Sequence, residues 1–127
     1  MIYGVGTDVV EIARIEKALA RFGERFARRI LCEAELPRFR CHRLPAAYLA
    51  KRFAAKEAFA KALGTGVHAP ANWHGVWVNN LNSGKPVLEF SDSLKVFLKI
   101  KGVTSAHVSL SYERGVAVAT VILECES

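Results

Sequence analysis

Near its C-terminal end the chain contains two runs of strand-forming residues, Ser105–Tyr112 and Val116–Glu124, separated only by Glu113, Arg114 and Gly115. A connection this short makes the two strands pair in antiparallel fashion, because parallel strands need a crossover of a dozen or more residues. In the first run apolar side chains alternate with polar ones, as in a strand with one buried and one solvated face. These two runs predict that the domain is built around an antiparallel sheet.

Patterns with the period of a helix occupy much of the remaining chain. Between Glu11 and Ile30, apolar residues recur at steps of three and four, which predicts a helix with a continuous apolar stripe. An alanine-rich helix is predicted over Ala46–Leu63, with Gly64 at its C-terminal cap. A short helix is predicted over about Ser93–Lys101, with Ser91 or Asp92 as its N-cap.

The other segments complete an α+β pattern. We expect a first strand over Ile2–Val10, two short strands over Gly75–Asn79 and Val87–Phe90, and an irregular or broken helix over Cys32–Leu44. Antiparallel hairpins with segregated helices indicate one α+β domain over 1–127, with an antiparallel sheet packed against helices.

Composition limits the kinds of partner. The 127 residues carry a net charge of +6, which favours an anionic partner: a nucleic acid, a phosphorylated ligand or an acidic protein. The isolated cysteines Cys32, Cys41 and Cys125 indicate neither a disulfide framework nor a zinc site. We find no signal-peptide pattern and no apolar run long enough to span a bilayer, so a cytosolic protein without a membrane partner is expected.

The segment Arg52–Gly66, RFAAKEAFAKALGTG, has the strongest chemical pattern. Glu57 and Lys61 are one helical turn apart, which suits an exposed salt bridge, or a carboxylate that holds a cation or a proton beside a phosphate-binding lysine. Asp8, which closes the first strand, is either a helix N-cap or a metal ligand. Two carboxylates, Asp8 and Glu57, would suit Mg²⁺, although the sequence does not show that they meet.

Two further patterns leave alternatives open. The Gly64-Thr65-Gly66 loop offers backbone N–H groups, but it follows a helix C-terminus, where the dipole disfavours anions, so a plain cap is favoured. His107 and Ser109 share one face of their strand, which is either half-solvated or part of a polar ligand pocket.

A second stripe on the first predicted helix is almost entirely basic. It is either a solvated face or a docking surface for a negative partner, and it consists of Arg14, Lys17, Arg21, Arg25 and Arg28. A nucleic-acid-binding domain is an alternative function that the charge permits. We expect no nucleic-acid partner, because the chain has no RNP-like aromatic motif and its aromatic residues lie at core-like spacing.

Four motifs together resemble the holo-acyl-carrier-protein synthases, the small bacterial 4′-phosphopantetheinyl transferases. They are GVGTDVVEIARI at 4–15, RFAAKEAFAKALGTG at 52–66, GKP at 84–86 and AHVSLSY at 106–112. The resemblance covers essentially the whole chain. It implies the fold of that family and a Mg²⁺-dependent transfer of 4′-phosphopantetheine from coenzyme A to a serine of acyl carrier protein, with release of adenosine 3′,5′-bisphosphate. Another coenzyme A-dependent or phosphate-processing enzyme on the same scaffold is the alternative.

The resemblance also implies roles for individual residues. Asp8 and Glu57 would bind Mg²⁺, Lys61 would contact the phosphate, and Glu57 or a metal-ordered water would be the base. The residues expected to bind coenzyme A are Arg52, Lys56, Lys61, Gly64, Thr65, Gly66, Gly84, Lys85, Pro86, His107 and Ser109.

Family members are typically homotrimers with active sites between subunits, and their basic first helix docks the carrier protein. Arg14, Arg21 and Arg25 would have that docking role here. Tyr112 departs from the family, which commonly has His at this place, so the role of that position does not carry over.

Overall fold

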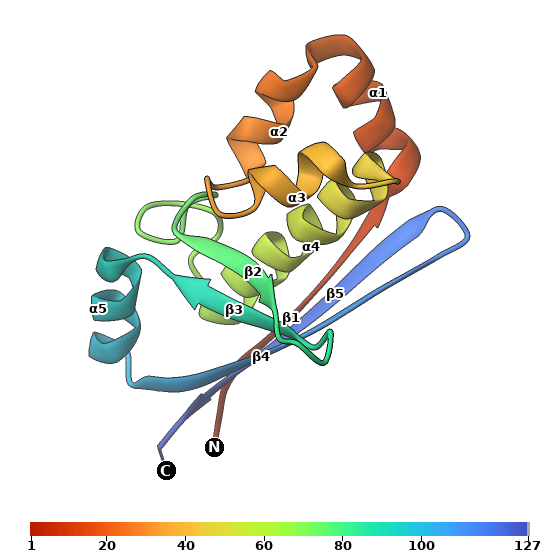
Figure 1. The fold of residues 1–127 in the computed structure, drawn as a ribbon. Helices are drawn as coiled ribbons and strands as arrows, with labels where there is room; N and C mark the ends of the chain where they lie inside the picture. Colours follow the sequence, from red (N-terminus) through yellow and green to blue (C-terminus); the bar gives the residue numbers. More distant parts are fainter. Residues whose placement is uncertain (127) are drawn as a thin grey trace.

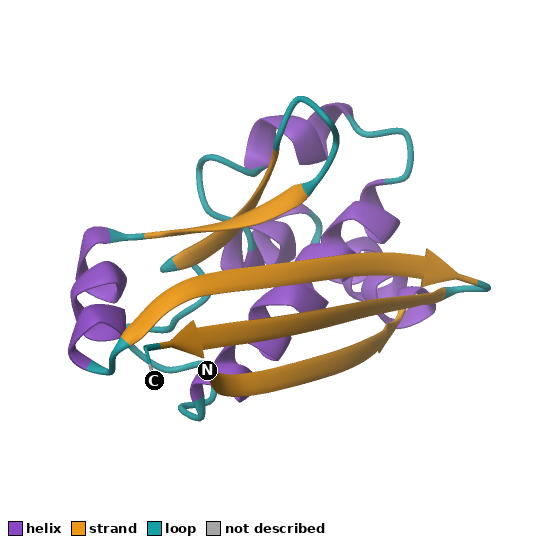
Figure 2. Ribbon diagram, turned by 90° about the horizontal axis from the view of Figure 1, so that it is seen from below, coloured by secondary structure: helices purple, strands orange, loops and turns teal. Residues whose placement is uncertain are grey.

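The computed structural model describes residues 1–126, and its largest sheet has three antiparallel strands. They are β1 (Ile2–Glu11), β5 (Val116–Cys125) and β4 (Val103–Glu113), in the order β1-β5-β4. Strands β4 and β5 form the expected hairpin, with Tyr112 opposite Ala117. The helices lie on one side of this sheet (Figure 1), and the sheet stands in front of them when the molecule is seen from below (Figure 2). The predicted α+β fold is confirmed.

Helix α4 (Pro45–Leu63) packs across the covered face of the sheet and is the central element of the core. Alanines favour the helix and leave little side-chain volume between it and its neighbours. Pro45 suits the first turn, where its missing N–H has no helical partner, and Gly64 ends the helix in a left-handed conformation with φ 87°. The helix predicted over Ala46–Leu63 is thus confirmed, one residue longer at its start.

Two glycines of β1 allow the strand to lie directly on this helix. A Cβ atom on Gly6 would overlap the carbonyl oxygen of Ala58, and one on Gly4 would overlap the carbonyl oxygen of Ala62. These glycines are used for close backbone approach, since any larger side chain would separate strand from helix. The approach determines how near Asp8, two residues beyond Gly6, lies to α4.

The single helix expected between Glu11 and Ile30 is wrong, because the chain forms two helices there. Helices α1 (Ile12–Phe22) and α2 (Glu24–Ile30) are separated at Gly23, whose φ of 64° is accessible mainly to glycine. The N–H of Gly23 donates to the carbonyl of Leu19 and closes α1. The apolar stripe is continuous in sequence, but the helix axis changes direction (Figure 1).

The remaining elements cover the helices and the end of the sheet. Helix α3 (Leu36–Cys41) lies within the segment predicted as irregular or broken helix. Strands β2 (Val76–Asn80) and β3 (Pro86–Phe90) form a separate antiparallel hairpin, within one residue of the predicted bounds. Helix α5 (Asp92–Ile100) begins at the expected cap, where the Ser91 side chain accepts from the N–H of Leu94.

The face of the large sheet opposite α4 is open in the part of the chain that the structure describes. Strand register places Val5, Thr7 and Val9 of β1 on that face with Thr120 and Ile122 of β5. Val5 and Val9 are 55% and 62% exposed, so this face presents apolar side chains to solvent. Figure 2 shows this face unobstructed.

Candidate active site

Three of the predicted catalytic and metal-binding residues meet where β1 crosses α4. The Lys61 ammonium donates to Asp8 Oδ1 and to the carbonyl oxygen of Thr7, both at 3.0 Å. Lys61 therefore pairs with a different element, and not with Glu57 one turn away on its own helix. Asp8, Glu57 and Lys61 line one cavity of about 510 Å³. Apolar side chains and one arginine complete its wall, among them Ile15, Phe26, Phe53 and Arg14.

The charges at this cavity suit a bound cation. Burial and the nearby Asp8 carboxylate raise the pKa of Glu57, while Lys61 opposes that effect. A raised pKa means that the second negative charge is costly until a positive group joins it. Within residues 1–126 no cluster of three or more His, Cys, Asp or Glu side chains could hold a metal by itself. Two carboxylates suit Mg²⁺, which completes its shell with water and substrate phosphates.

Lys56, expected to contact a phosphate of coenzyme A, is instead buried. Its side chain is 1% exposed, and the ammonium donates to Glu35 Oε1 and to the carbonyl oxygens of Ile30 and Trp73, at 2.6–2.7 Å. The Glu35 carboxylate also accepts from the N–H groups of Cys32 and Val78. Burial lowers the pKa of Lys56, and Glu35 opposes this effect. This burial is incompatible with the expected phosphate contact, since every donor is already used inside the core.

A second cavity, of about 620 Å³, lies between α3, α4 and β2 and is strongly basic. Arg52 is only 4% exposed, and its guanidinium lies 4.2 Å from the centre of the Tyr48 ring. Its terminal nitrogen donates to Asn80 Oδ1 at 2.9 Å, whereas its buried Nε has no hydrogen-bond partner among the described residues. Arg38, Arg43 and Lys51 also line this cavity.

Burial and neighbouring positive charges lower the pKa values of two side chains in this cavity, His42 and Lys51. Burial and the neighbouring Lys51, Arg52 and Arg38 lower the pKa of His42. Burial and Arg52 likewise lower the pKa of Lys51. Crowded cations of this kind are relieved by a bound anion. The sequence contains a signal for this cavity in the closely spaced Arg38, Arg40 and Arg43, but only the fold shows which of them meet Arg52.

The predicted Gly84-Lys85-Pro86 motif lies beside this basic cavity. Asn80, which lines the cavity, donates through Nδ2 to the carbonyl oxygen of Gly84 at 3.0 Å, and Pro86 is its partner in the strand register. The structure therefore brings the motif and Arg52 together, although 31 residues separate Arg52 from Gly84 in the sequence. Asn80 itself was not among the residues that the sequence singled out.

The other predicted coenzyme A contacts are elsewhere. His107 and Ser109 face the open side of the sheet, where His107 Nε2 is 2.6 Å from Glu124 Oε1 and lowers the pKa of that carboxyl. Gly64-Thr65-Gly66 follows the end of α4, with the Thr65 hydroxyl donating to the Gly66 carbonyl. None of these residues lines either cavity. One chain therefore does not collect all the predicted contacts in one place.

The predicted docking arginines lie on α1 and α2. Arg14 lines the cavity that contains Asp8, Arg21 lies 5.1 Å from the centre of the Phe22 ring, and Arg25 lines a groove with Phe22 and Phe26. Phe22 is 49% exposed, so an apolar side chain lies among the arginines. Tyr112 is on the helix-facing side of β4, as its alternation predicts, with the Lys51 ammonium 5.2 Å from the centre of its ring.

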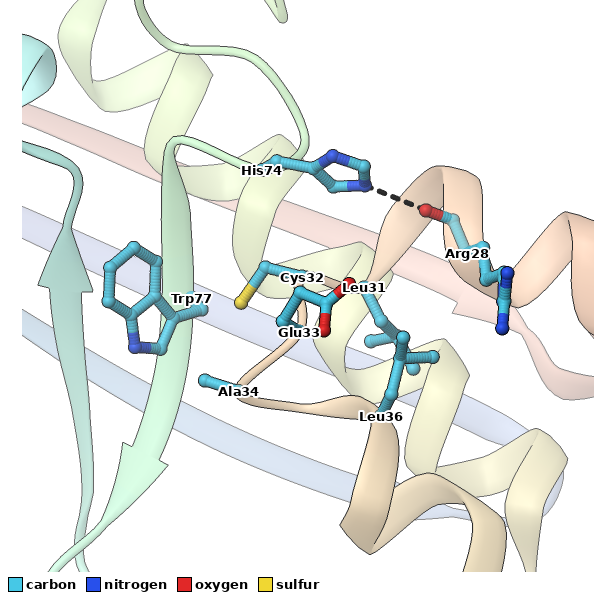
Figure 3. A pocket seen from close by; sticks show the side chains of 8 residues that line it. All are labelled: Arg28, Leu31, Cys32, Glu33, Ala34, Leu36, His74 and Trp77. Atoms are coloured by element: carbon cyan, nitrogen blue, oxygen red, sulfur yellow. Dashed lines mark hydrogen bonds between the residues drawn. The ribbon is translucent and has the colours of Figure 1, made fainter.

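A third cavity, of about 590 Å³, is lined by Cys32, His74 and Arg28 of the basic stripe, but by none of the predicted catalytic, metal-binding or coenzyme A-binding residues. Figure 3 shows the His74 ring directed at the carbonyl oxygen of Arg28, to which its Nε2 donates at 2.7 Å. Burial and the Glu35 charge raise the pKa of the Cys32 thiol, which disfavours the reactive thiolate. This cavity therefore does not have the chemistry of a nucleophilic site.

Comparisons with known proteins agree with the fold and the motifs. Residues 4–121 match the 4′-phosphopantetheinyl transferase superfamily. A holo-[acyl-carrier-protein] synthase of Azoarcus sp. is 52% identical over 124 residues, which is 98% of each chain. The crystal structure of the synthase from Neisseria meningitidis superposes with a TM-score of 0.95 at 41% identity, over 98% of this chain and 99% of that one. The Bacillus anthracis synthase, in complex with CoA (3′,5′-ADP), has a TM-score of 0.83 at 36% identity, over 99% of both chains.

The chain therefore belongs to the 4′-phosphopantetheinyl transferase superfamily and is an enzyme. Within that superfamily it groups with the holo-[acyl-carrier-protein] synthases. No helix in residues 1–126 is long and apolar enough to cross a membrane.

The buried ion pair yields a stability prediction. Lys56→Met should lower the free energy of unfolding by about 3–5 kcal/mol, because it leaves the Glu35 carboxylate buried without its countercharge. Urea denaturation measures this loss. Lys95→Met on the exposed face of α5 is the matched control and should change stability by less than about 0.5 kcal/mol. A Lys56→Met protein of normal stability with a raised KM for coenzyme A would instead restore the phosphate-contact role.

Proposed function

We propose that the chain transfers 4′-phosphopantetheine from coenzyme A to a serine of apo acyl carrier protein, in a Mg²⁺-dependent reaction that releases adenosine 3′,5′-bisphosphate. The observation that carries this proposal is the meeting of Asp8, Glu57 and Lys61 in one cavity. These residues supply two carboxylates for a cation and one ammonium for a phosphate, which is what a pyrophosphate substrate requires. The complex of the Bacillus anthracis relative with CoA supports coenzyme A as the donor.

The residues around the cavity suit each part of the transfer. The serine oxygen forms a bond to the phosphorus next to the pantetheine, and the bond from that phosphorus to the bridging oxygen of the pyrophosphate breaks. Glu57 would accept the serine proton, directly or through a water, from the cavity that it shares with Asp8 and Lys61. Lys61 offsets the negative charge left on the bisphosphate. Mg²⁺, held by Asp8 and Glu57, would neutralise the pyrophosphate oxygens.

The coenzyme A site is divided between two sides of α4. Arg52 and Lys61 are nine residues apart, about two and a half helical turns, so their side chains leave the helix in opposite directions. The cavities that they line have no residue in common. Arg52 and Lys61 of one chain therefore do not meet in a shared cavity, whereas two neighbouring chains could each supply one of them to the same ligand. This arrangement supports active sites at subunit interfaces.

A homotrimer provides such interfaces, and the open sheet face is the surface that would form them. This face exposes Val5 and Val9 beside Thr120 and Ile122. It also carries His107, which is among the residues expected to bind coenzyme A. Burying the face against another copy would remove apolar surface from water and bring His107 into the shared site.

The carrier protein would dock on α1 and α2. Acyl carrier proteins are acidic, and Arg21 and Arg25 lie on either side of the exposed Phe22 in sequence, which offers charge and apolar contact together. Arg14 lies at the wall of the cavity with Asp8, so a docked carrier protein would present its serine to that cavity. Opposite charges on the two proteins would speed their encounter and make it salt-sensitive.

The reaction would take place in the cytoplasm and serve fatty acid biosynthesis. Cys32, Cys41 and Cys125 are all free thiols, as in a reducing compartment. Holo acyl carrier protein, the product, is the thiol-bearing carrier that such a synthesis needs.

Intact-mass analysis of apo acyl carrier protein tests the reaction. With coenzyme A and Mg²⁺ the carrier protein should gain one phosphopantetheine group, and EDTA should prevent the gain. Asp8→Ala and Glu57→Ala should each lower kcat/KM at least about a hundredfold without changing the fold, because both hold the cation and Glu57 also accepts the proton. Gain of an acyl or phosphoryl group would favour a different coenzyme A-dependent enzyme, and no gain with several carrier proteins would refute the proposal.

Mixing inactive chains tests whether sites are shared between subunits. Glu57→Ala and Arg52→Gln chains, unfolded and refolded together, should regain part of the activity, because some interfaces then combine an intact Glu57 with an intact Arg52. Glu57→Ala mixed with Asp8→Ala is the control and should regain none, since both changes affect the same half of the site. Equal failure of both mixtures would place the complete site within one chain, and sedimentation analysis reports whether trimers form.

Charge reversal tests the docking surface. The double variant Arg14→Glu and Arg21→Glu should raise KM for acyl carrier protein about tenfold or more, while the affinity for coenzyme A stays unchanged. Lys95→Glu with Lys99→Glu on α5 makes the same charge change elsewhere and should leave both values as in the wild type. If the two double variants behave alike, net charge and not a docking site determines the encounter.

A further inference from the structure

Two arginines from different helices converge on one neutral side chain. Arg38 of α3 donates through Nη1 to Asn80 Oδ1 at 2.7 Å, and Arg52 of α4 donates through Nη2 to the same oxygen at 2.9 Å. Among residues 1–126 neither guanidinium forms an ion pair with a carboxylate, although Arg52 is 4% exposed. A buried arginine usually has an anionic partner, so Arg52 is unusual in this respect.

The orientation of the amide follows from its neighbours. A guanidinium can only donate, so the Asn80 oxygen must face Arg38 and Arg52, and the amide nitrogen must face away. The nitrogen then donates to the carbonyl oxygen of Gly84 at 3.0 Å. Asn80 therefore connects the two arginines to the loop that contains Lys85. Its amide oxygen accepts from both guanidiniums, and its amide nitrogen donates to Gly84.

We propose that Asn80 is a positioning residue for coenzyme A: it holds Arg38 and Arg52 in place without neutralising them, so that both can bind a phosphate of the substrate. The unpartnered Arg52 Nε supports this proposal, because a buried donor without a partner in the protein is available for a ligand oxygen. The cavity of about 620 Å³ beside the two arginines leaves room for the ligand. The inference rests on the proposed function, since it names coenzyme A as the source of the phosphate.

The neutrality of Asn80 is the essential property. An aspartate at this position could accept from both guanidiniums more strongly than an amide. It would also place a permanent negative charge where the phosphate must bind, and like charges would then oppose the substrate. The same carboxylate would compensate the two cations in the protein without ligand, but it would lose the hydrogen bond that the amide nitrogen donates to the Gly84 carbonyl. These two effects on stability oppose each other, whereas the added negative charge acts against the phosphate alone.

The test compares Asn80→Asp with Asn79→Asp. Asn79 is the neighbouring residue of β2, its side chain faces Glu89 on the other side of the strand, and an aspartate there retains the acceptor for the N–H of Asn80. Calorimetric titration with coenzyme A should give a dissociation constant at least about tenfold higher for Asn80→Asp, while a cooperative melting transition without ligand shows that the variant is folded. Asn79→Asp should bind as the wild type does.

Titration with dephospho-coenzyme A identifies which phosphate is bound. If Asn80→Asp weakens coenzyme A and leaves dephospho-coenzyme A unchanged, the arginine pair holds the 3′-phosphate. If it weakens both equally, the pair holds the pyrophosphate. Either result supports the positioning role, and wild-type affinity of Asn80→Asp for coenzyme A would overturn it.

A second variant covers the case in which Asn80→Asp does not fold. Arg38→Gln changes an exposed residue of α3 and should raise the dissociation constant of coenzyme A several-fold; unchanged affinity would overturn the proposal that the two arginines act together. Both titrations omit the carrier protein. A wild-type protein that binds coenzyme A but does not transfer phosphopantetheine would therefore refute the proposed function. The titrations would still decide whether Asn80 positions the arginines for binding coenzyme A.

Discussion

The close approach of β1 to α4 is the constraint on which the geometry of the candidate active site depends. Gly4 and Gly6 have no side chain, so the strand rests on the carbonyl groups of Ala58 and Ala62. This contact places Asp8 within reach of Lys61, at 3.0 Å, and close enough to Glu57 to raise the pKa of that carboxyl. A strand held farther away by a side chain would leave the two carboxylates on separate elements with no shared cavity.

Helix α4 separates a cavity of mixed charge from a strongly basic one. One side carries Glu57 and Lys61 toward Asp8, and the other carries Arg52 toward Arg38 and Asn80. Between them, Lys56 points into the core and is neutralised by Glu35. Charged residues that are close together in one motif thus have different surroundings, because successive positions of a helix face different directions. The division is the basis of the proposal that a complete coenzyme A site needs two subunits.

Motif and geometry contribute differently to the interpretation of this chain. The pattern RFAAKEAFAKALGTG, together with the opening GVGTDVVEIARI, points to Asp8, Glu57 and Lys61, and the structure places these residues around one cavity. The same pattern also suggests that Lys56 is exposed to a phosphate, which its burial contradicts. A motif shows that a residue is needed, but it does not distinguish a residue that contacts the ligand from one that supports the core.

Local features could be predicted from the sequence. The alanine-rich run with its Gly64 cap predicted the long helix, Ser91 or Asp92 predicted the start of the short helix, and short turns between strand-like runs predicted the hairpins, because these features depend on residues close together in the chain. Tertiary structure decided what depends on long-range contacts. It placed Glu35 against Lys56, and Arg38 and Arg52 on Asn80, and it left one sheet face uncovered. Gly23 shows the difference between local pattern and tertiary structure. The apolar stripe continues unbroken through it in the sequence, but its positive φ ends one helix and starts the next in a new direction.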